Sequence, residues 1–348
     1  MTAPKFDVSP EKRATILAFI KRQLFVTPAL PTRDQYDLSG KTAIVTGANS
    51  GIGLETSRQL LDLGLSRLVI AVRSQSRGEA ARDNLLAGRD AEKHVVEVWP
   101  LDLEKYESIT ACAQRAEVEL GRLDILVNNA GVMKKTFGRN QETGHEHVVQ
   151  TNYLSQALLT ILLLPVIKQK SAPDGPGRVV LVNSDVAAYA RFSERDAPSL
   201  LAALDEENNF QDQERYATSK LLGQLFLTEL ARRVPPGVIV VNAPNPGLTK
   251  SNLGGDYKGS VAGFLAEHLF LRILGRAPDV GARSITCAAV MYGQESHGQY
   301  IEDGKMQPLA PLLYKPEGSK LAEMLWRETI DDLAPYGVAD IVAGLIAK

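Results

Sequence analysis

The sequence has little cysteine, no excess of one charge and no apolar segment at its start. Its two cysteines, Cys112 and Cys287, are too few for a disulfide framework, so we predict a reducing, cytoplasmic location. The formal net charge of -2 offers neither the basic excess typical of nucleic-acid binding nor an acidic tail. Residues 1–10 are polar and do not resemble a secretion signal. We also expect no apolar run that approaches the length of an integral membrane segment.

Internal repeats, low-complexity tracts and a dividing linker are missing as well, which favours one domain over two. We place this domain at residues 38–348, after an N-terminal extension at 1–37 that ends in a stretch with two prolines. Within the extension, Ala14 to Phe25 is amphipathic. Packing on the domain as an additional helix is the favoured interpretation, and contact with a membrane surface is the alternative.

Short β-branched or aliphatic runs alternate with longer helical segments from residue 41 onward. Most runs are apolar on both faces, as in a buried parallel sheet, so the pattern predicts a doubly wound α/β fold. The expected strands are Thr42–Val45, Leu68–Val72, Val95–Trp99, Ile125–Val127, Val179–Asn183 and Val238–Asn242. The clearest helices are Leu54–Leu63, Gly144–Lys168 and Tyr216–Arg233.

Two segments interrupt this alternation. Arg191–Asp212 is rich in polar residues and is interpreted as an insertion in which the acidic run from Asp205 forms a solvated loop. Thr249–Arg276 leaves the carboxyl end of the sixth strand, where open α/β sheets bind their ligands. We therefore predict that residues 249–276 cover a substrate. Their apolar part favours a lipophilic substrate, and core packing is the alternative explanation for it.

A glycine-rich turn joins the first strand to the first helix. Glycines at these positions let a backbone approach a pyrophosphate, and the helix that follows directs its N–H groups at the phosphates. The spacing is G-x-x-x-G-x-G rather than G-x-G-x-x-G, and turn formation alone is the weaker alternative. The residues predicted to contact a dinucleotide here are Gly47, Asn49, Ser50, Gly51, Ile52 and Gly53.

The end of the second strand lacks the carboxylate that would bind the ribose 2′-hydroxyl of NAD. Arg73 follows that strand instead, and Arg77 comes one helical turn later. A guanidinium can pair with a 2′-phosphate, whereas a carboxylate would repel it. The sequence therefore favours NADP(H), although a purely solvated Arg73 is the alternative.

Together with this turn, three further motifs resemble the short-chain dehydrogenase/reductase family: Asn128-Asn129-Ala130-Gly131, Ser184, and Tyr216-Ala217-Thr218-Ser219-Lys220. The resemblance runs from about residue 38 to 301, with the motifs in the family's order. Ala71 to Ser74, Leu101 to Leu103 and the leucine-rich helix up to Pro165 look most like the retinol-dehydrogenase-like branch. The chain is also similar to fungal reductases of secondary metabolism that carry an N-terminal extension. The resemblance implies one Rossmann domain with a seven-stranded, mostly parallel sheet.

The resemblance also assigns cofactor contacts. It implies that Asp102 accepts the adenine amino group, that Asp124 braces the Asn-Ala-Gly motif, and that the turn after the sixth strand meets the nicotinamide amide and a phosphate. Turn formation is the alternative for each motif. The implied contact residues are Asp102, Leu103, Asn129, Ala130, Gly131, Tyr216, Lys220, Pro246, Gly247, Leu248 and Thr249.

Tyr216 and Lys220 are four residues apart and share one face of a helix. A free tyrosine has a pKa of about 10, and we expect the lysine charge, together with that of the nicotinamide when oxidised, to favour tyrosinate. Tyr216 would then act as the acid or base, and Lys220 would also hold the nicotinamide ribose. By resemblance, Ser184 stabilises the substrate oxygen and Asn152 helps a water connect the lysine to solvent. Asp185 is unusual beside Ser184, and a surface position is favoured over contact with cofactor or substrate.

His145-Glu146-His147 does not have metal-site spacing, because histidines two apart on a helix diverge, and no metal is predicted. The sequence thus predicts an NADP(H)-dependent enzyme that interconverts a carbonyl compound and an alcohol, with a small-molecule substrate and no nucleic-acid partner. A non-catalytic dinucleotide-binding sensor or scaffold is the alternative, and an isomerase or epimerase is a third. The resemblance leaves a homodimer open. Substrate identity, stereochemistry and direction do not follow from the sequence.

Overall fold

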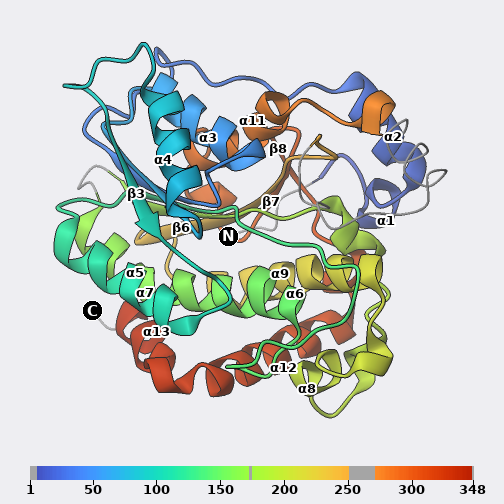
Figure 1. The fold of residues 1–348 in the computed structure, drawn as a ribbon. Coiled ribbons are helices and arrows are strands. Elements are labelled where there is room, and N and C mark those ends of the chain that lie inside the picture. Colours follow the sequence, from blue (N-terminus) through green and yellow to red (C-terminus); the bar gives the residue numbers. More distant parts are fainter. Residues whose placement is uncertain (1–5, 172–174, 251–270, 347–348) are drawn as a thin grey trace.

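The computed structural model describes residues 6–171, 175–250 and 271–346. An eight-stranded sheet with the order β3-β2-β1-β4-β5-β6-β7-β8 runs through the molecule between layers of helices (Figure 1). Only β8 is antiparallel to its neighbour among these strands. The strands are β1 Thr42–Thr46, β2 Arg67–Val72, β3 Val95–Pro100, β4 Ile125–Asn128, β5 Gly177–Leu181, β6 Ile239–Asn245, β7 Tyr300–Glu302 and β8 Lys305–Gln307.

The doubly wound fold is confirmed, but the expected count of seven strands is one too low. Beyond the six strands located in the sequence, β7 and β8 form a hairpin of three-residue strands around Asp303 and Gly304, both of which have positive φ. Strands this short show no usable alternation of apolar and polar residues.

Alternate residues of each strand enter two different cores. Ile44 of β1 belongs to the core beneath the sheet, whereas Ala43 and Val45 belong to the core above it. Figure 1 shows α3, α4 and α11 on one face and α5, α7 and α9 on the other, with α12 and α13 forming a further layer below. These helices span α3 Gly51–Asp62, α4 Gln75–Leu86, α5 Tyr106–Glu119, α7 Ser155–Lys170, α9 Asp212–Arg233, α11 Pro278–Val290, α12 Pro316–Asp332 and α13 Val338–Ile346.

The helical stretch His147–Lys170 corrects the expectation that no apolar run approaches the length of a membrane segment. It combines α6 (His147–Val149), a π-helical turn at Gln150–Leu154, and α7. This stretch is long and apolar enough to cross a membrane, yet 89% of its most apolar window is buried inside the protein. It is therefore the core helix of the domain, and its hydropathy reflects burial on all sides.

The N-terminal extension packs on the domain, as predicted, through α1 (Pro10–Arg13) and α2 (Ile16–Phe25). Ser9 and Thr15 cap the two helices by accepting hydrogen bonds from Lys12 N and Ala18 N. Arg13 is 2% exposed and pairs with Glu302 of β7 at 3.1 Å. The extension is thus attached to strand β7 of the sheet by a buried ion pair.

In the insertion at 191–212, the acidic residues Glu206 and Glu207 are exposed, as predicted, whereas Asp205 is half-buried. The insertion contains the short helix α8 (Leu200–Leu204), whose first turn is held by Glu328 of α12. Asp205 accepts a hydrogen bond from the His145 ring at 2.8 Å. His145 precedes α6 instead of lying on a helix, and the described residues contain no group of side chains suited to a metal ion.

The predicted substrate cover at 249–276 lies mostly outside the described residues. Its two described ends meet, because Thr249 and Arg276 form an isolated parallel bridge.

Candidate active site

The glycine turn sits at the carboxyl end of β1 and opens α3. Gly47 and Gly51 have φ of +65° and +57°, which favours glycine. A Cβ on Gly53 would lie 2.4 Å from the side-chain nitrogen of Asn129. Ser50 is the N-cap of α3, yet its side chain makes no capping hydrogen bond. The turn is therefore a tight backbone cradle at an uncapped helix N-terminus, which suits an anion.

The Asn-Ala-Gly motif after β4 is joined to this turn through Thr46. The Thr46 hydroxyl accepts hydrogen bonds from Asn129 N and Ala130 N, both at 3.0 Å. The Asn129 side chain donates in return to Thr46 O at 2.9 Å. Asp124 lies at the other end of β4, where it accepts hydrogen bonds from Thr42 N and Arg122; its bracing of this motif stays a prediction.

Arg73 follows β2 directly and is exposed. Because Thr46 pairs with Ala71 in the parallel register, Arg73 lies at the same sheet edge as the glycine turn. No ion pair engages Arg73 within the described chain. Asp102 follows β3 at that edge and caps the next turn by accepting from Glu104 N at 3.1 Å; Leu103 is buried beside it.

Tyr216, Lys220 and Asn152 lie on two neighbouring helical segments. The Lys220 ammonium is 5.7 Å from the centre of the Tyr216 ring and donates to Val182 O at 3.1 Å. The Asn152 side chain donates to the Ser219 hydroxyl at 3.1 Å, and that hydroxyl donates to Tyr216 O at 2.7 Å. The π-helical turn and α9 are thereby locked together around the three predicted residues.

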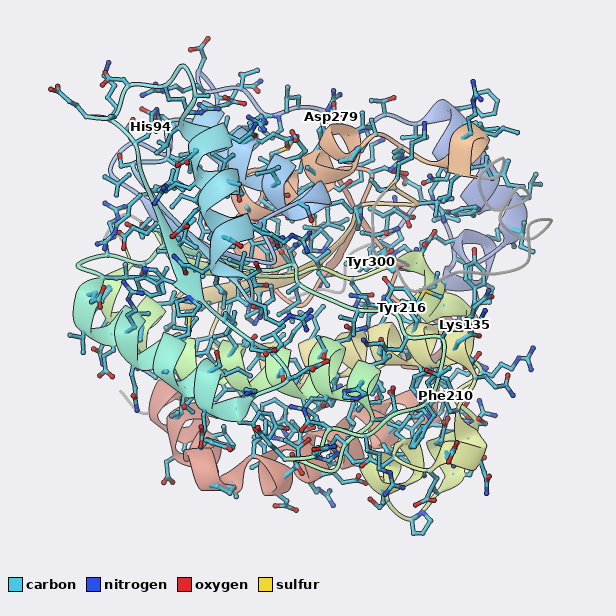
Figure 2. The ribbon with its side chains drawn as sticks, in the orientation of Figure 1. His94, Lys135, Phe210, Tyr216, Asp279 and Tyr300 are labelled. Carbon is cyan, nitrogen blue, oxygen red and sulfur yellow. The ribbon has the colours of Figure 1, made fainter. Side chains whose placement is uncertain are left out.

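Asn183 fastens the segment that carries Ser184 to α9, the helix of Tyr216 and Lys220. The Asn183 side chain donates to Lys220 O at 2.9 Å and accepts from Gln224 at 3.0 Å, so the end of β5 is fastened to α9. The Ser184 hydroxyl donates to Asp185 at 3.3 Å and is partly exposed. Figure 2 shows Tyr216 far from His94, which immediately precedes β3 and therefore marks the amino end of that strand.

Burial decides the charge states in this site. It lowers the pKa of Lys220 to about 8. It raises the pKa of Tyr216, and the nearby charge of Asp185 raises it further. Burial and the Asp185 charge thus keep Tyr216 protonated in the protein by itself, and the expected preference for tyrosinate, which includes the charge of an oxidised nicotinamide, is not produced by these residues alone.

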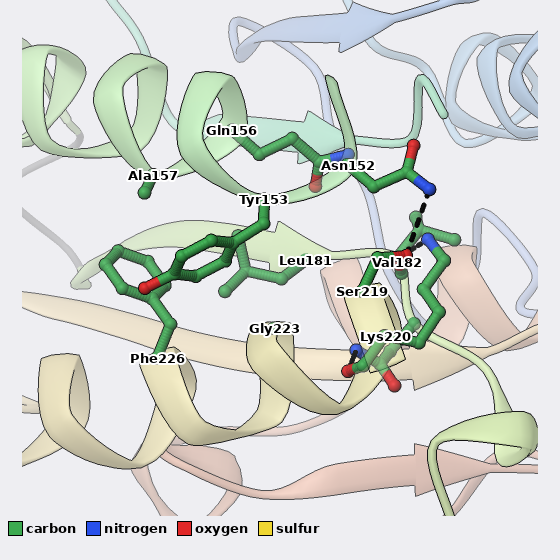
Figure 3. A pocket seen from close by; sticks show the side chains of 11 residues that line it. Asn152, Tyr153, Gln156, Ala157, Leu181, Val182, Ser219, Lys220, Gly223 and Phe226 are labelled. Carbon is green, nitrogen blue, oxygen red and sulfur yellow. Dashed lines mark hydrogen bonds between the residues drawn. The ribbon is translucent and has the colours of Figure 1, made fainter. Parts of the chain in front are cut away.

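A small cavity lies behind Lys220 (Figure 3). Its volume of about 20 Å³ is enough for one water. Asn152 and Lys220 line it on the polar side, and Tyr153, Leu181 and Phe226 on the apolar side. The cavity supplies the space that a water between Asn152 and Lys220 requires.

The backbone of the turn after β6 lies close to the side chains that surround it. Gly247 has φ of +75°, and a Cβ there would lie 2.5 Å from the Gln23 side-chain oxygen. The Thr249 hydroxyl donates to Gly247 O at 3.1 Å. Pro246 is buried and Leu248 partly buried. The turn therefore packs directly against the N-terminal extension.

Asp185 is buried, so its predicted surface position is wrong. Its carboxylate pairs with Arg22 of α2 at 3.5 Å. Sequence reasoning also missed Thr46, Ser219 and Gln23, which connect the motifs. Thr46 stands next to the glycine turn and could have been noticed, whereas no local pattern marks Gln23, because its partners are more than 200 residues away.

These residues fit a nicotinamide dinucleotide. The uncapped start of α3 and the glycine cradle suit a pyrophosphate. The partly exposed Gly131 lies next to the buried side chains of Asn152 and Lys220 and continues this surface toward them. The described residues at the end of β2 present a cation rather than a carboxylate.

Comparison with known proteins agrees with this arrangement. The family model for short chain dehydrogenases matches residues 41–194. The short-chain dehydrogenase fogG of Aspergillus ruber is 47% identical over 348 residues, covering 99% of each chain. The short chain dehydrogenase/reductase mfmJ of Annulohypoxylon moriforme is 39% identical and covers 94% of each chain.

Solved structures show the same fold. An uncharacterized protein from Mycobacterium paratuberculosis superposes with a TM-score of 0.63 at 26% identity, covering 88% of this chain and 98% of its own. The RhlG/NADP complex of Pseudomonas aeruginosa gives a TM-score of 0.57 at 25% identity, covering 77% and 96%. The predicted similarity to fungal reductases is confirmed, while the retinol-dehydrogenase-like branch stays a prediction. The chain belongs to the short-chain dehydrogenase/reductase family of oxidoreductases.

Proposed function

We propose that this protein interconverts a ketone or aldehyde and the corresponding alcohol with NADP(H), on a lipophilic substrate of fungal secondary metabolism in the cytoplasm. The observation that carries the proposal is the assembly of Tyr216, Lys220, Ser184 and Asn152 at one sheet edge. Relatives with fungal short-chain dehydrogenase names and a structural neighbour bound to NADP support it.

In the reducing direction, Tyr216 donates its proton to the carbonyl oxygen. Its raised pKa keeps the hydroxyl protonated at neutral pH, as an acid requires. Ser184 donates a hydrogen bond to the same oxygen and stabilises its developing charge. When bound, NADPH supplies the hydride that the carbonyl carbon receives.

Lys220 and Asn152 restore the proton. With a pKa near 8, Lys220 can both hold and release a proton near neutrality. Asn152 borders the cavity behind it and can orient a water there. In the alcohol-oxidising direction the same groups accept the proton in reverse order.

The cofactor contacts are proposed from the same geometry. Gly47 to Gly53 would hold the pyrophosphate, and Asp102, Leu103 and Asn129 to Gly131 the adenosine side. Pro246 to Thr249, with Tyr216 and Lys220, would hold the nicotinamide side. Arg73 would select the 2′-phosphate.

The direct test of this function is Tyr216→Phe, which removes the proton donor and keeps the ring. We expect turnover with NADPH to fall by about 10²- to 10⁴-fold on any carbonyl compound that the unchanged protein reduces. NADPH affinity, measured by fluorescence titration, should stay within a few-fold. Tyr336→Phe, in the layer of α12 and α13, is the matched control. Full turnover by the Tyr216 variant would refute the acid assignment.

Cofactor preference is tested with Arg73→Ala. Losing a charge-assisted contact to the 2′-phosphate should weaken NADPH binding by about tenfold to hundredfold and leave NADH binding nearly unchanged. Arg82→Ala, on an exposed position of α4, is the control. Tighter binding of NADH than of NADPH by the unchanged protein would contradict the proposed preference.

The inactive sensor makes a different prediction, namely NADPH binding without turnover on any member of a broad carbonyl panel. The complete set of four site residues argues against it. An isomerase would retain NAD tightly, which the cation at Arg73 disfavours.

A further inference from the structure

The polar face of α2 contacts the segment that carries Ser184. Arg22 reaches the Asp185 carboxylate with Nη2 at 3.5 Å and the Glu302 carboxylate with Nε at 3.0 Å. Its side chain is 17% exposed, and those of Asp185 and Glu302 are 7% and 2% exposed. Arg22 therefore compensates two buried carboxylates, one of which accepts a hydrogen bond from the Ser184 hydroxyl.

The next residue of α2 holds the turn after β6. Gln23 donates from Nε2 to Leu248 O at 2.9 Å and to Leu274 O at 2.8 Å, and its Oε1 accepts from Leu248 N at 3.3 Å. Both backbone polar groups of Leu248 are thus bonded to one side chain of the extension. Gly247 beside it leaves just enough room for that amide.

The two contacts are joined by a buried network. Glu302 Oε1 accepts from Arg13 at 3.1 Å and from Asn245 at 2.9 Å. Asn245 Oδ1 in turn accepts from Gly247 N at 2.9 Å. Through Arg22 and Gln23, the extension therefore contacts both the segment that carries Ser184 and the turn after β6. The Glu302 carboxylate connects these two contacts.

We propose that α2 is a positioning element of the active site, in which Arg22 holds and compensates Asp185 beside Ser184 and Gln23 holds the turn Pro246–Thr249. This inference rests on the proposed function, because it assigns the extension a role in that same reaction. Neither residue touches the reacting atoms; both act through neighbours.

The charges around Asp185 determine the direction in which substitutions shift the pKa of Tyr216. Tyr216 faces Asp185 and Lys220. Among the described residues, the titratable and charged groups that face Asp185 are Arg13, Arg22, Tyr189, Tyr216, Tyr300 and Glu302. Removing the Arg22 charge leaves Asp185 less compensated, which raises the pKa of Tyr216, whereas removing the Asp185 charge lowers it.

The experiment is a mutant cycle on the pH profile of kcat/KM for alcohol oxidation. Arg22→Gln should shift the rising limb by about 0.5 to 1 pH unit to the alkaline side, and Asp185→Asn should shift it to the acid side. In the Asp185→Asn background, Arg22→Gln should add no further alkaline shift. Arg22→Lys should restore most of the profile, and Lys21→Gln, which removes an exposed charge from the same helix, should leave it unchanged.

A cofactor-free readout accompanies the kinetics. Ultraviolet titration of tyrosinate, taken as the difference between each variant and its Tyr216→Phe counterpart, should show the same order of Tyr216 pKa values. An Arg22→Gln profile that coincides with that of Lys21→Gln would overturn the role of Arg22. If Arg22→Gln fails to fold, Asp185→Asn still decides, because an unshifted titration contradicts the coupling.

The role of Gln23 is tested by separating KM from kcat. Gln23→Leu should raise the KM for NADPH about fivefold to twentyfold with kcat largely retained, because the turn loses its support. An unchanged KM overturns this part of the inference. If the unchanged protein reduces no carbonyl compound, the proposed function fails, while tyrosinate titration still tests the arrangement by itself.

Discussion

At the scale of single residues, Lys220 shows how function and stability oppose each other. Its side chain is 6% exposed, and Val182 O accepts one hydrogen bond from its ammonium. An ammonium in such a place loses most of its hydration, and burial accordingly lowers its pKa to about 8. Burial of the Lys220 ammonium thus lowers the stability of the folded protein, and we attribute this loss to the role of the lysine in proton transfer.

We predict that Lys220→Met stabilises the cofactor-free protein at pH 7 by roughly 1 to 3 kcal/mol and abolishes turnover. Between pH 8 and about 10.5 the unfolded chain binds the proton more strongly than the folded one, so the stability of the unchanged protein rises with pH in this window. Urea unfolding at pH 7 and pH 9.5 measures both effects. The advantage of the variant should shrink at the higher pH, and an advantage that stays constant would contradict the assignment.

At the scale of elements, the π-helical turn at Gln150–Leu154 determines where Asn152 points. The Asn152 side-chain amide accepts a hydrogen bond from Val132 N and donates one to Val132 O, both at 2.8 Å. Glu146 caps the start of this helical stretch by accepting from Val148 N and Val149 N. An extra residue in one helical turn is a known way to direct a side chain at a functional site.

His145 joins two other elements, the insertion and α12. Its ring lies 2.8 Å from Asp205 and 2.9 Å from Asp332, and hydrogen bonds to these carboxylates outweigh burial and raise its pKa to about 9. Because the folded state holds the proton more tightly, this stabilisation is complete below the ordinary histidine pKa of about 6.5 and is lost as pH rises through about 9.

We therefore predict that the unchanged protein loses stability between pH 6.5 and pH 9 relative to His145→Gln. Urea unfolding of both proteins at four pH values across this window measures the difference. Parallel curves for the two proteins would show that His145 does not contribute the linkage.

At the scale of the whole molecule, the N-terminal extension is held by buried charge. Arg13 and Glu302 are both 2% exposed, and the Arg13 guanidinium also lies 4.7 Å from the centre of the Tyr300 ring. Breaking one partner of such a pair leaves an uncompensated charge in the interior.

Arg13→Met should therefore lower the free energy of unfolding by about 3 to 5 kcal/mol. Arg327→Met removes an exposed partner of Glu323 and should cause little or no loss. Urea unfolding midpoints of the two variants provide the comparison. Equal, small losses in both would mean that the extension is not held by this pair.

Local signals in the sequence were sufficient for much of the fold, and the four proposed catalytic residues that they singled out lie around one sheet edge. Buried strands such as β1 are apolar on both faces, and the glycine turn requires φ values that glycine adopts. The strands β7 and β8 escaped prediction because three residues carry no period. Asp185 was misplaced because burial of an acid depends on a partner from elsewhere in the chain.

The sequence by itself determined the doubly wound sheet, the glycine cradle and the shared helical face of Tyr216 and Lys220, because each follows from residues close together in the chain. Only the tertiary structure decided which charges are compensated and which pKa values shift. It placed Arg22 and Gln23 of the extension against Asp185 and Leu248, 163 and 225 residues away. Burial and ion pairing depend on such distant neighbours, and no local pattern encodes them.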